Sequence, residues 1–502
     1  MRSRVMLAAG ALAALAGLAV SEGLAAVLDL RESPVLSVGQ SVIDVTPGPV
    51  AHAVIDAVGT RDKPLAVTGV VVAIILLGAL AGRWWRSRRL VAWLLVAVPV
   101  VLAVVSVLSR PHASTAGVLT CVGAGAAVVA VLELLLRPAA EAGTAGGQSR
   151  RTFLVRAGLV ALATVVVGGA GQVLGARHRR RREIEAARAS LDLPVGRVAA
   201  PAGTGLGVPG QQPWLTPNRD FYRIDTTLSP PLIDPADWSL RIHGMVDREM
   251  TLTYQDLVDR GLTQAWITIA CVSNEVGGDL IGNTVWGGVP IKDLLDEVGV
   301  QDGADALLST SEDGWTCGTP LAALTDGRPA LLALTMDGEP LPVVHGFPVR
   351  QVVPGLYGYV SATKWVTDWE VTRFADFQAF WTKRGWGERG PVKIQSRIDV
   401  PQSGDSIDAG PVTVAGVAWA QHVGVAAVEV RIDDGPWRSA SLGAVPNDDT
   451  WVQWSLAWDA PKGDHTLQVR AIGKDGVPQT AERAGVLPDG ATGYDKVDVV
   501  VG

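Results

Sequence analysis

The sequence predicts five N-terminal transmembrane helices, then an α+β domain, then a C-terminal immunoglobulin-like β-sandwich. The 502 residues have a mean hydropathy of +0.26, but the long apolar runs all lie before residue 176. Short strand and helix patterns follow one another after residue 213, and regularly spaced β-patterned runs fill the rest of the chain. We therefore expect a membrane domain at 1–182, a linker at 183–213, an α+β domain at 214–390 and an immunoglobulin-like domain at 391–502.

The membrane prediction rests on five apolar runs, each close to the roughly 20 residues that cross a bilayer core. They are Val5–Leu28, Leu65–Ala81, Leu90–Leu108, Ala116–Leu136 and Phe153–Leu174. Arginines gather before the first run, between the second and third, and between the fourth and fifth. Cytoplasmic loops carry an excess of Lys and Arg, so the N-terminus is expected inside and everything after the fifth helix outside. Arg177 and Arg179–Arg182, on the expected outer side, are an exception.

The fifth run is preceded by Ser149-Arg150-Arg151-Thr152-Phe153-Leu154, which has the form of a twin-arginine export signal. The alternative interpretation is a basic flank that follows the charge rule by chance. The twin-arginine translocase exports domains that are already folded, which suits a cofactor inserted in the cytoplasm. We therefore expect the translocase as a partner, and a multi-pass cytoplasmic membrane protein with its catalytic domain on the extracytoplasmic side.

The expected membrane helices carry few groups for chemistry. His52, His112 and His178 lie in loops or at helix ends, so these histidines are not placed to bind haem between helices. Glu133 lies within a span, where ionisable groups are often functional, but a single acid near a helix end also fits a role in packing. The simplest interpretation of this domain is an anchor, with docking of a partner as an additional role.

The extramembrane part begins with a Pro- and Gly-rich linker over residues 194–213. The globular sequence then opens with Asn-Arg-Asp220-Phe221-Tyr222-Arg223-Ile-Asp-Thr. Interleaved aromatic and basic side chains suit an anionic, planar ligand. The alternative is a structured loop that buries Phe221 in the core.

Short strands and helices follow over residues 214–375, as in an α/β or α+β domain. Trp238–Val246 alternates as a strand does, and Thr253 is placed to N-cap a short helix. Ile291–Val298 has the pattern of an amphipathic helix, and Ala306–Ser311 that of another strand.

The chemistry of the chain is expected at Cys271. An apolar, β-prone run from Trp266 delivers this cysteine to a polar, glycine-rich turn that contains Asn274. A stiff strand followed by a permissive turn can present a thiol beside a large ligand. Motifs of the types C-x-x-C, H-E-x-x-H and G-x-G-x-x-G after a strand are missing from the sequence. A single thiolate can still bind a transition metal whose other ligands come from a cofactor.

Two structural alternatives for Cys271 stay open at this point. One is simple burial in the core. The other is a disulfide with Cys317 in an oxidising compartment, since Cys121 lies within an apolar run.

A second dense segment runs from Met336 to Trp365 and contains His345, Arg350 and Lys364. Strand and glycine-turn sequence separates these three residues, so they could converge on one ligand. Arg offers a planar fork for phosphate and Lys a point charge. The alternative is that they are scattered surface charges, but neighbouring Gly and Pro residues fix the backbone where the charges emerge.

The C-terminal part has β-patterned runs separated by Asp- and Gly-containing turns, which is typical of a β-sandwich of immunoglobulin-like architecture. The runs are Val392–Val400, Val412–Ala420, Val425–Ile432, Trp451–Trp458 and Asp464–Ile472. Such modules more often build interfaces than active sites.

Over roughly residues 214–500 these segments resemble the sulfite oxidase family of molybdenum enzymes. Ile-Ala-Cys271-Val-Ser-Asn274 is similar to the family segment whose cysteine ligates molybdenum, and His345-Gly-Phe-Pro-Val-Arg350 with Lys364-Trp365 to the segment that holds the pterin. The resemblance implies Mo-molybdopterin as cofactor and a C-terminal dimerisation domain, hence a homodimer. It implies Cys271 as the metal ligand, and Cys271, Arg223 and Tyr357 as catalytic residues. The cofactor contacts that it implies are Asp220, Phe221, Tyr222, Arg223, Asn274, His345, Arg350, Ser361 and Lys364.

The sequence departs from the family after Cys271. Sulfite oxidases have arginines there that help to bind sulfite, whereas Glu275 and Val276 occupy this place. The loop from Pro354 to Lys364 is one residue longer than in those enzymes, and a cytochrome domain is not apparent in the sequence.

We therefore expect oxygen-atom transfer to or from a small molecule, with electrons passing through a separate carrier, a cytochrome or a quinone-linked protein. Nucleic acid is not expected as a partner. The alternatives are an S-oxide or N-oxide reductase with the same cofactor, and a non-catalytic anchored binding protein.

Overall fold

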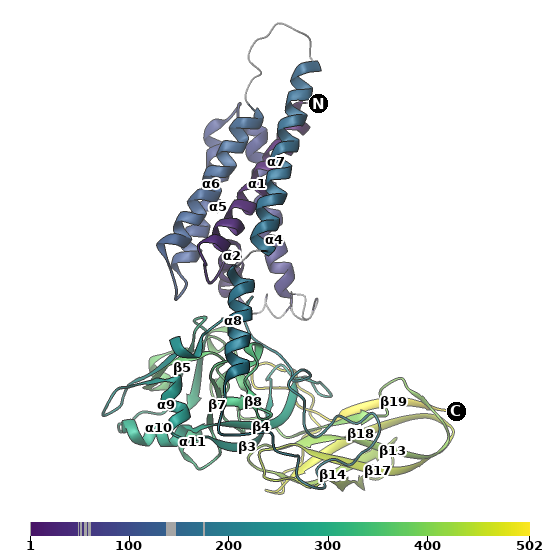
Figure 1. Cartoon of the computed structure of the whole chain (residues 1–502). Helices are drawn as coiled ribbons and strands as arrows, with labels where there is room; N and C mark the ends of the chain where they lie inside the picture. The colour runs from purple at the N-terminus through teal and green to yellow at the C-terminus, as the bar shows by residue number, and fades with distance from the viewer. Residues whose placement is uncertain are drawn as a thin grey trace. The chain divides into compact units, whose positions relative to one another are not determined.

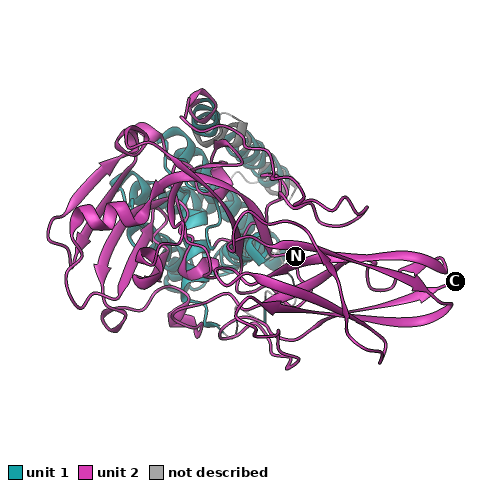
Figure 2. Cartoon of the chain, turned by 90° about the horizontal axis from the view of Figure 1, so that it is seen from below, with its two compact units in different colours: residues 1–186, 226–232 teal, residues 187–225, 233–502 magenta. Residues whose placement is uncertain are grey.

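The computed structural model describes residues 2–48, 50, 53–54, 58, 62–136, 147–173 and 176–502. Contacts divide the chain into two compact units, shown in two colours in Figure 2. The first comprises residues 1–186 and 226–232, and the second residues 187–225 and 233–502.

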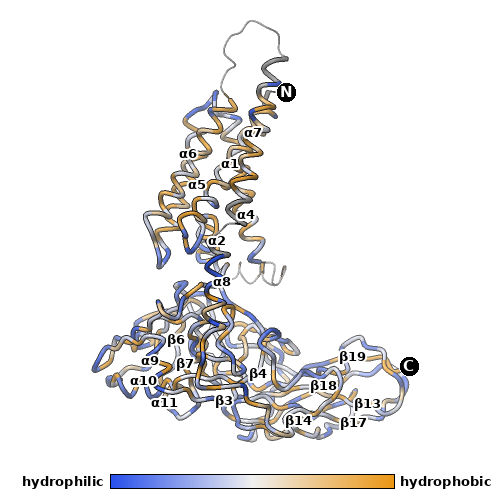
Figure 3. Tube along the Cα trace, in the orientation of Figure 1, coloured by the Kyte–Doolittle hydropathy of each residue, from blue (hydrophilic) through white to orange (hydrophobic). Residues whose placement is uncertain are grey.

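The first unit is helical (Figure 1). Its helices are α1 (Arg2–Val27), α2 (Pro34–Val45), α4 (Asp62–Trp84), α5 (Arg89–Leu108), α6 (Thr115–Leu136) and α7 (Gly147–Val173), and α8 (Ala176–Ser190) leads into the second unit. Figure 3 shows hydrophobic residues along α1 and α4–α6, whereas α8 is hydrophilic.

Among the described residues four helices, not the expected five, are long and apolar enough to cross a membrane. They are Ser3–Val27, Asp62–Trp84, Arg89–Leu108 and Thr115–Leu136. The expected count of five is therefore not matched. The fifth run lies in α7, whose apolar part is only Phe153–Gly168 and is shorter than the roughly 20 residues needed. Leu174, its expected end, and Arg137 before it lie outside the described residues.

Close helix packing in this unit depends on small residues. A Cβ added at Gly10 of α1 would lie 2.1 Å from the Gly78 carbonyl oxygen of α4. One added at Gly82 would lie 2.3 Å from the Met6 carbonyl oxygen. Small residues let apolar helices approach to backbone contact, which is the usual source of their association in lipid. Glu133 of α6 accepts hydrogen bonds from Arg89 Nη2 at 2.6 Å and Trp85 Nε1 at 3.2 Å, which fits a role in packing.

The first unit also includes a short segment from far along the chain, Thr226–Leu232. The Gln40 side chain of α2 donates to the Thr226 carbonyl at 3.2 Å and accepts from the Leu228 backbone NH at 3.1 Å. Lys63 Nζ donates to the Thr227 carbonyl at 2.8 Å. The chain thus leaves the second unit directly after Asp225 and returns to it at Ile233.

The second unit contains two β-sheets with short helices between their strands, followed by a β-sandwich. One sheet has the order β2-β1-β10-β5-β6, with β1 and β10 parallel and the other pairs antiparallel. Its strands are β1 (Ser239–Gly244), β2 (Met250–Thr253), β5 (Ala306–Ser311), β6 (Thr316–Pro320) and β10 (Val366–Thr372).

The second sheet has the order β3-β4-β7-β8 and is antiparallel, with β9 paired to β7. Its strands are β3 (Thr263–Ala270), β4 (Ile281–Pro290), β7 (Leu331–Met336), β8 (Glu339–Pro340) and β9 (Arg350–Val352). The helices of these layers are α9 (Tyr254–Asp259), α10 (Ile291–Val298), α11 (Ala322–Thr325), and the 3-10 turns η2 (Pro235–Asp237), η3 (Val343–His345), η4 (Gly358–Val360), η5 (Phe374–Asp376) and η6 (Thr382–Arg384).

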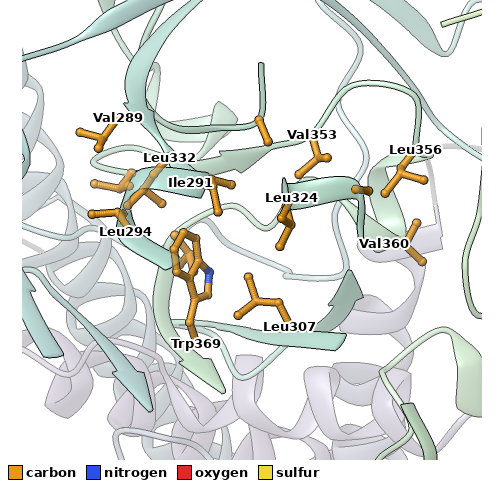
Figure 4. Close-up of a cluster of buried hydrophobic side chains, with 14 of the residues drawn as sticks. Val289, Ile291, Leu294, Leu307, Leu324, Leu332, Val353, Leu356, Val360 and Trp369 are labelled. Atoms are coloured by element: carbon orange, nitrogen blue, oxygen red, sulfur yellow. The ribbon is translucent and has the colours of Figure 1, made fainter. Parts of the chain in front are cut away.

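Local sequence explains the helices here. Thr253 caps α9, as predicted, in a reciprocal capping box with Asp256. Helix α10 has the predicted bounds and turns Ile291, Leu294, Leu295 and Val298 inward. Figure 4 shows Ile291 and Leu294 in one apolar cluster with Leu332 of β7 and Trp369 of β10. Leu295 and Val298 belong to the same cluster.

The C-terminal sandwich consists of a four-stranded sheet, β11-β13-β17-β16, and a five-stranded sheet, β12-β19-β18-β14-β15. The strands are β11 (Gln395–Val400), β12 (Ser406–Ile407), β13 (Gly410–Trp419), β14 (Val425–Ile432), β15 (Arg438–Ser439), β16 (Ser441–Leu442), β17 (Val452–Ala460), β18 (Gly463–Gly473) and β19 (Asp495–Val501). Alternate residues of the long strands fill the core, as Val497, Val499 and Val501 of β19 do. All five predicted runs form strands here, and β19 is a strand that the pattern did not reveal.

Candidate functional site

Cys271 lies at the end of the buried strand β3. The strand ends at Ala270, and the Cys271 backbone NH donates to the Leu280 carbonyl at 2.9 Å. The thiol is buried and free, and so is that of Cys317, so the two do not form a disulfide. Burial raises the pKa of the Cys271 thiol, while hydrogen bonds from the backbone and hydroxyl of Ser273 oppose this rise.

The turn after Cys271 folds back on the strand. Asn274 donates its backbone NH to the Cys271 carbonyl at 3.1 Å, and its Oδ1 accepts from the Leu280 backbone NH at 2.8 Å. A Cβ at Gly278 would lie 2.6 Å from Asn274 Oδ1, so only glycine fits there. Asn274 therefore sets the shape of the cysteine turn.

The aromatic loop that the sequence singled out lies against the His345 segment. The Phe221 ring is buried, with its centroid 5.4 Å from Tyr222, 5.8 Å from Trp286 and 5.8 Å from His345. A Cβ at Gly282 of β4 would lie 2.7 Å from this ring, so the glycine makes room for it. The structure confirms that Phe221 is buried, and binding of a planar anion by this loop stays a prediction.

Arg350 and Lys364 are brought side by side by an antiparallel β-bridge between them. Gly346 makes the close approach possible, because a Cβ there would lie 3.1 Å from Arg350 Cβ and 3.2 Å from Lys364 Cα. Its φ of +115° is also a conformation that favours glycine. The Arg350 guanidinium lies over the Trp286 ring at 5.1 Å from the centroid.

His345 closes this cluster from the other side. Its Nε2 is 3.1 Å from the Asn218 carbonyl oxygen and donates to it, which leaves Nδ1 as an acceptor. Burial, and then the charges of Arg350 and Lys364, lower the pKa of His345 to about 3. His345 is therefore neutral across the physiological range.

Burial lowers the pKa of both cations of this cluster, Arg350 and Lys364. It lowers the pKa of Arg350 to about 10 and that of Lys364 to about 8. Asp225 opposes both changes. Its Oδ2 lies 3.2 Å from Lys364 Nζ and 2.9 Å from Arg223 Nε. Arg223 is thus held at the edge of the cluster by a carboxylate that the sequence prediction had not assigned to the site.

Three residues that were predicted to contact the cofactor or to act in catalysis, Asp220, Ser361 and Tyr357, make contacts within the protein. The exposed Asp220 carboxylate pairs with its neighbour Arg219 at 3.3 Å. The buried Ser361 hydroxyl donates to the Leu356 carbonyl at 3.1 Å and the Tyr357 carbonyl at 2.9 Å, so it fastens the turn of η4.

Tyr357 is buried, and its hydroxyl accepts from the Lys393 backbone NH at 3.4 Å. Burial raises its pKa to about 12, and the nearby Cys271 adds to the rise. The phenol therefore keeps its proton at neutral pH.

Several buried polar atoms around this cluster lack a hydrogen-bond partner within the described part of the chain. They are Asn218 Oδ1, Asn274 Nδ2, His345 Nδ1 and Arg350 Nε. Buried polar groups are rarely left unpaired in folded proteins. Unpaired donors and acceptors beside two cations and a buried thiol fit a polar, anionic ligand that also carries a metal.

The described His, Cys, Asp and Glu side chains do not gather in a group of three that could hold a metal ion. A metal at Cys271 would therefore take its other ligands from a cofactor, as a dithiolene provides. Trp286, Asn218 and Asp225 are residues of this site that sequence reasoning missed. The Arg-x-Asp spacing of 223 and 225 was the only signal in the sequence for the last of them.

Comparison with known proteins identifies both parts of the second unit. Residues 227–381 match the oxidoreductase molybdopterin binding domain, and residues 395–469 match the bacterial Ig domain. The chain is 34% identical over 157 residues to the uncharacterized oxidoreductase YuiH of Bacillus subtilis, covering 31% of this chain and 76% of that protein. The chain belongs to the sulfite oxidase family.

More distant relatives agree with this assignment. Mitochondrial sulfite oxidase of Homo sapiens is 27% identical over 305 residues, covering 51% of this chain and 55% of that protein, so the chain spans about half the length of this relative. The sulfane dehydrogenase SoxCD of Paracoccus pantotrophus shares the fold, with a TM-score of 0.50 and 22% identity over 61% of this chain and 90% of that one.

Membership of the sulfite oxidase family confirms three predictions: the enzyme class is oxidoreductase, the cofactor is molybdopterin, and the C-terminal domain is immunoglobulin-like. The individual cofactor contacts remain predictions. The geometry brings Phe221, Tyr222, Arg223, His345, Arg350 and Lys364 together near Cys271.

Proposed function

We propose that this protein is a membrane-anchored enzyme that moves an oxygen atom to or from a small molecule on the extracytoplasmic face. The observation that carries the proposal is the buried, free thiol of Cys271 beside Arg350, Lys364 and unpaired polar atoms. The molybdenum cofactor supplies the two-electron redox chemistry and the oxygen-atom transfer. The protein supplies ligation, orientation and charge.

Each residue has a definite role in this proposal. Cys271 ligates the metal, and Arg350 binds the cofactor phosphate with its planar fork. Neutral His345 presents its unpaired Nδ1 as an acceptor to the pterin. Lys364 adds a second cation, and the protonated Tyr357 hydroxyl could donate a hydrogen bond to a ligand of the bound cofactor. Arg223 orients ligands at the more open edge, where its side chain is 40% exposed.

The membrane placement rests on the four apolar helices and on the arginine-flanked start of α7. Although the apolar part of α7, Phe153–Gly168, is shorter than those of the four other helices, we infer that this 27-residue helix also crosses the membrane, after export by the twin-arginine translocase. Reporter fusions after residue 190 test this. A periplasmic-type reporter that is active, and that becomes inactive when Arg150 and Arg151 are both changed to Lys, supports the extracytoplasmic side; a reporter active only in the cytoplasm contradicts it.

Electrons have to enter or leave through a separate carrier, a cytochrome or a quinone-linked protein, and the immunoglobulin-like domain is proposed as a homodimer contact. The decisive experiment is molybdenum analysis of the purified protein together with two assays. Sulfite with an artificial acceptor measures oxidation, and sulfoxides with a reduced dye measure reduction. Molybdenum at one atom per chain with activity in either assay supports the enzyme. Its reproducible absence from protein made in a molybdenum-replete host supports a binding protein instead.

Reduction of S-oxides or N-oxides is the second candidate function. Glu275 stands where sulfite oxidases have a sulfite-binding arginine, and its side chain is exposed. That substitution removes a reason to favour the sulfite anion as substrate.

A further inference from the structure

The Asp225 carboxylate pairs with two cations of the site. A single oxygen of its carboxylate, Oδ2, pairs with both Arg223 Nε at 2.9 Å and Lys364 Nζ at 3.2 Å. The Asp225 and Lys364 side chains are 6% and 9% exposed, so water screens this pair little. Lys364 Nζ also donates to the Ile224 carbonyl at 3.1 Å, which holds the amine on the Asp225 loop.

The charges can be summed for the site with its cofactor. Arg223, Arg350 and Lys364 contribute three positive charges, and neutral His345 contributes none. Asp225 contributes one negative charge, and a phosphate monoester about 1.5 to 2 more. The site therefore has almost no positive charge left for a second anion.

Another acid lies near the same carboxylate. Asp313, on the turn between β5 and β6, has its pKa raised by burial and also by the negative charge of Asp225. An incoming anion would meet an Asp225 carboxylate that already pairs with Arg223 and Lys364. Like charges in a partly buried site repel each other strongly enough to decide between ligands.

We propose that Asp225 is a specificity-determining residue that makes the site reject anionic substrates, so that the enzyme acts on an oxygen donor or acceptor without net charge. The inference rests on the proposed function and deepens it. A substrate with an uncharged sulfur or nitrogen centre loses little hydration on entry, whereas sulfite would meet Arg223 and Lys364 already paired with Asp225.

Two probes of the same tetrahedral shape test this: sulfate, a dianion, and dimethyl sulfone, which is uncharged. Each is titrated by calorimetry into the full-length, molybdenum-loaded protein in detergent. The wild-type protein is expected to bind dimethyl sulfone at least as tightly as sulfate. Sulfate binding that is tighter than dimethyl sulfone binding would overturn the proposal, and this measurement needs no variant.

Variants locate the effect at Asp225. Asp225→Asn keeps the shape and frees the two cations, so sulfate should bind about tenfold tighter or more while dimethyl sulfone binding is unchanged. The double variant Asp225→Asn/Arg223→Gln should lose most of this gain. Glu429→Gln, which removes a carboxylate paired with Arg470 at 2.6 Å in the sandwich, is the matched control and should change neither affinity.

The outcomes separate the two proposals. A protein without molybdenum contradicts the proposed function. A molybdenum-loaded protein whose Asp225→Asn variant leaves the ratio of sulfate to sulfone affinity unchanged contradicts only the role of Asp225. Where Asp225→Asn does not fold, Arg223→Gln replaces it, and this variant should shift the ratio further toward the sulfone; a shift toward sulfate counts against the proposal.

Discussion

The Arg397 guanidinium of the immunoglobulin-like domain donates a 2.7 Å hydrogen bond from Nη1 to the backbone carbonyl of Gly278, in the turn that follows Cys271. Its Nε donates to Asp399 Oδ1 at 2.7 Å, and both side chains are less than 10% exposed. The same turn leads through Leu280 back to the Cys271 backbone. The C-terminal domain thus holds the turn that follows Cys271, the proposed metal ligand, although the sequence indicated only an interface module.

We predict that Arg397 positions this turn. Arg397→Met should lower kcat about tenfold, because the turn loses a buried charge-assisted bond of about 1.5–3 kcal/mol. It should also change the Mo(V) electron paramagnetic resonance spectrum of the loaded enzyme, which a purely structural role would not do. Arg397→Lys should restore part of the activity.

Stability needs a separate control here, because Arg397→Met leaves the Asp399 carboxylate buried without its partner, at a cost of about 3–5 kcal/mol. Adding Asp399→Asn removes that charge and keeps the acceptor for the Gln212 backbone NH. If the double variant regains both stability and the wild-type spectrum, Arg397 does not position the turn.

Cys271→Ser should lower molybdenum-dependent activity at least about 100-fold. Loss of a group that only hydrogen-bonds to a metal ligand already costs about 10–100-fold in metal affinity or activity. The measurement is activity per molybdenum atom, with metal content determined on the same sample. Cys317→Ser is the matched control, because Cys317 is also buried, among hydroxyl groups of Ser309, Thr319 and Thr363. Full activity in Cys271→Ser would remove the central assignment.

Arg350→Met should weaken cofactor retention about 10–100-fold, the equivalent of one lost hydrogen bond to a charged group. The fluorescence of oxidised pterin released from the purified variant measures retention. Arg373→Met is the control, because Arg373 is exposed and donates to the Gly303 carbonyl at 3.1 Å. Equal pterin content in both variants would place the phosphate elsewhere.

Gly282→Ala should disturb the site through Phe221. The added Cβ would lie 2.7 Å from the Phe221 ring, and overpacking of this kind costs about 1–3 kcal/mol. We expect a lower unfolding temperature together with reduced pterin content. Gly261→Ala provides a control for glycine replacement at an open position, where its own cost comes from a φ of +80°; pterin loss of the same size in that variant would argue against a role for Phe221.

The pair of His465 and Asp433 in the sandwich gives a pH prediction. The Asp433 carboxylate, 2.9 Å from His465 Nδ1, raises the pKa of His465 above its unfolded value. The stabilisation is therefore complete below the unfolded pKa of about 6.5 and is lost as pH rises through the folded pKa. For this screened pair it amounts to about 0.5 kcal/mol at most.

Asp433→Asn removes the charge and suits the positive φ of 52° at this position. Mass spectrometry of His465 ring-hydrogen exchange should then show a lower pKa. An unchanged pKa of His465 would mean that the charge of Asp433 does not stabilise the protonated imidazole.

The order of domains, the cysteine-bearing strand and the two ligand segments could be predicted from the sequence, because each depends on a local pattern. An apolar β-prone run ends at Cys271, and Gly346 permits the turn between His345 and Arg350 whatever lies elsewhere in the chain. The expected five spans are not matched by the four long apolar helices of the described residues, because α7 is only partly apolar.

The tertiary structure alone decided which side chains meet. Asp225 and Lys364 are 139 residues apart, and Arg397 and Gly278 are 119 apart, so no local pattern encodes either contact. In the folded chain the Asp220 carboxylate pairs with Arg219, and the Ser361 hydroxyl donates to the Leu356 carbonyl. Local patterns fix backbone conformation, whereas the pairing of charges depends on which segments the packed core brings together. For this enzyme the sequence therefore identified the cofactor, and the fold revealed which charged side chains pair with one another near Cys271.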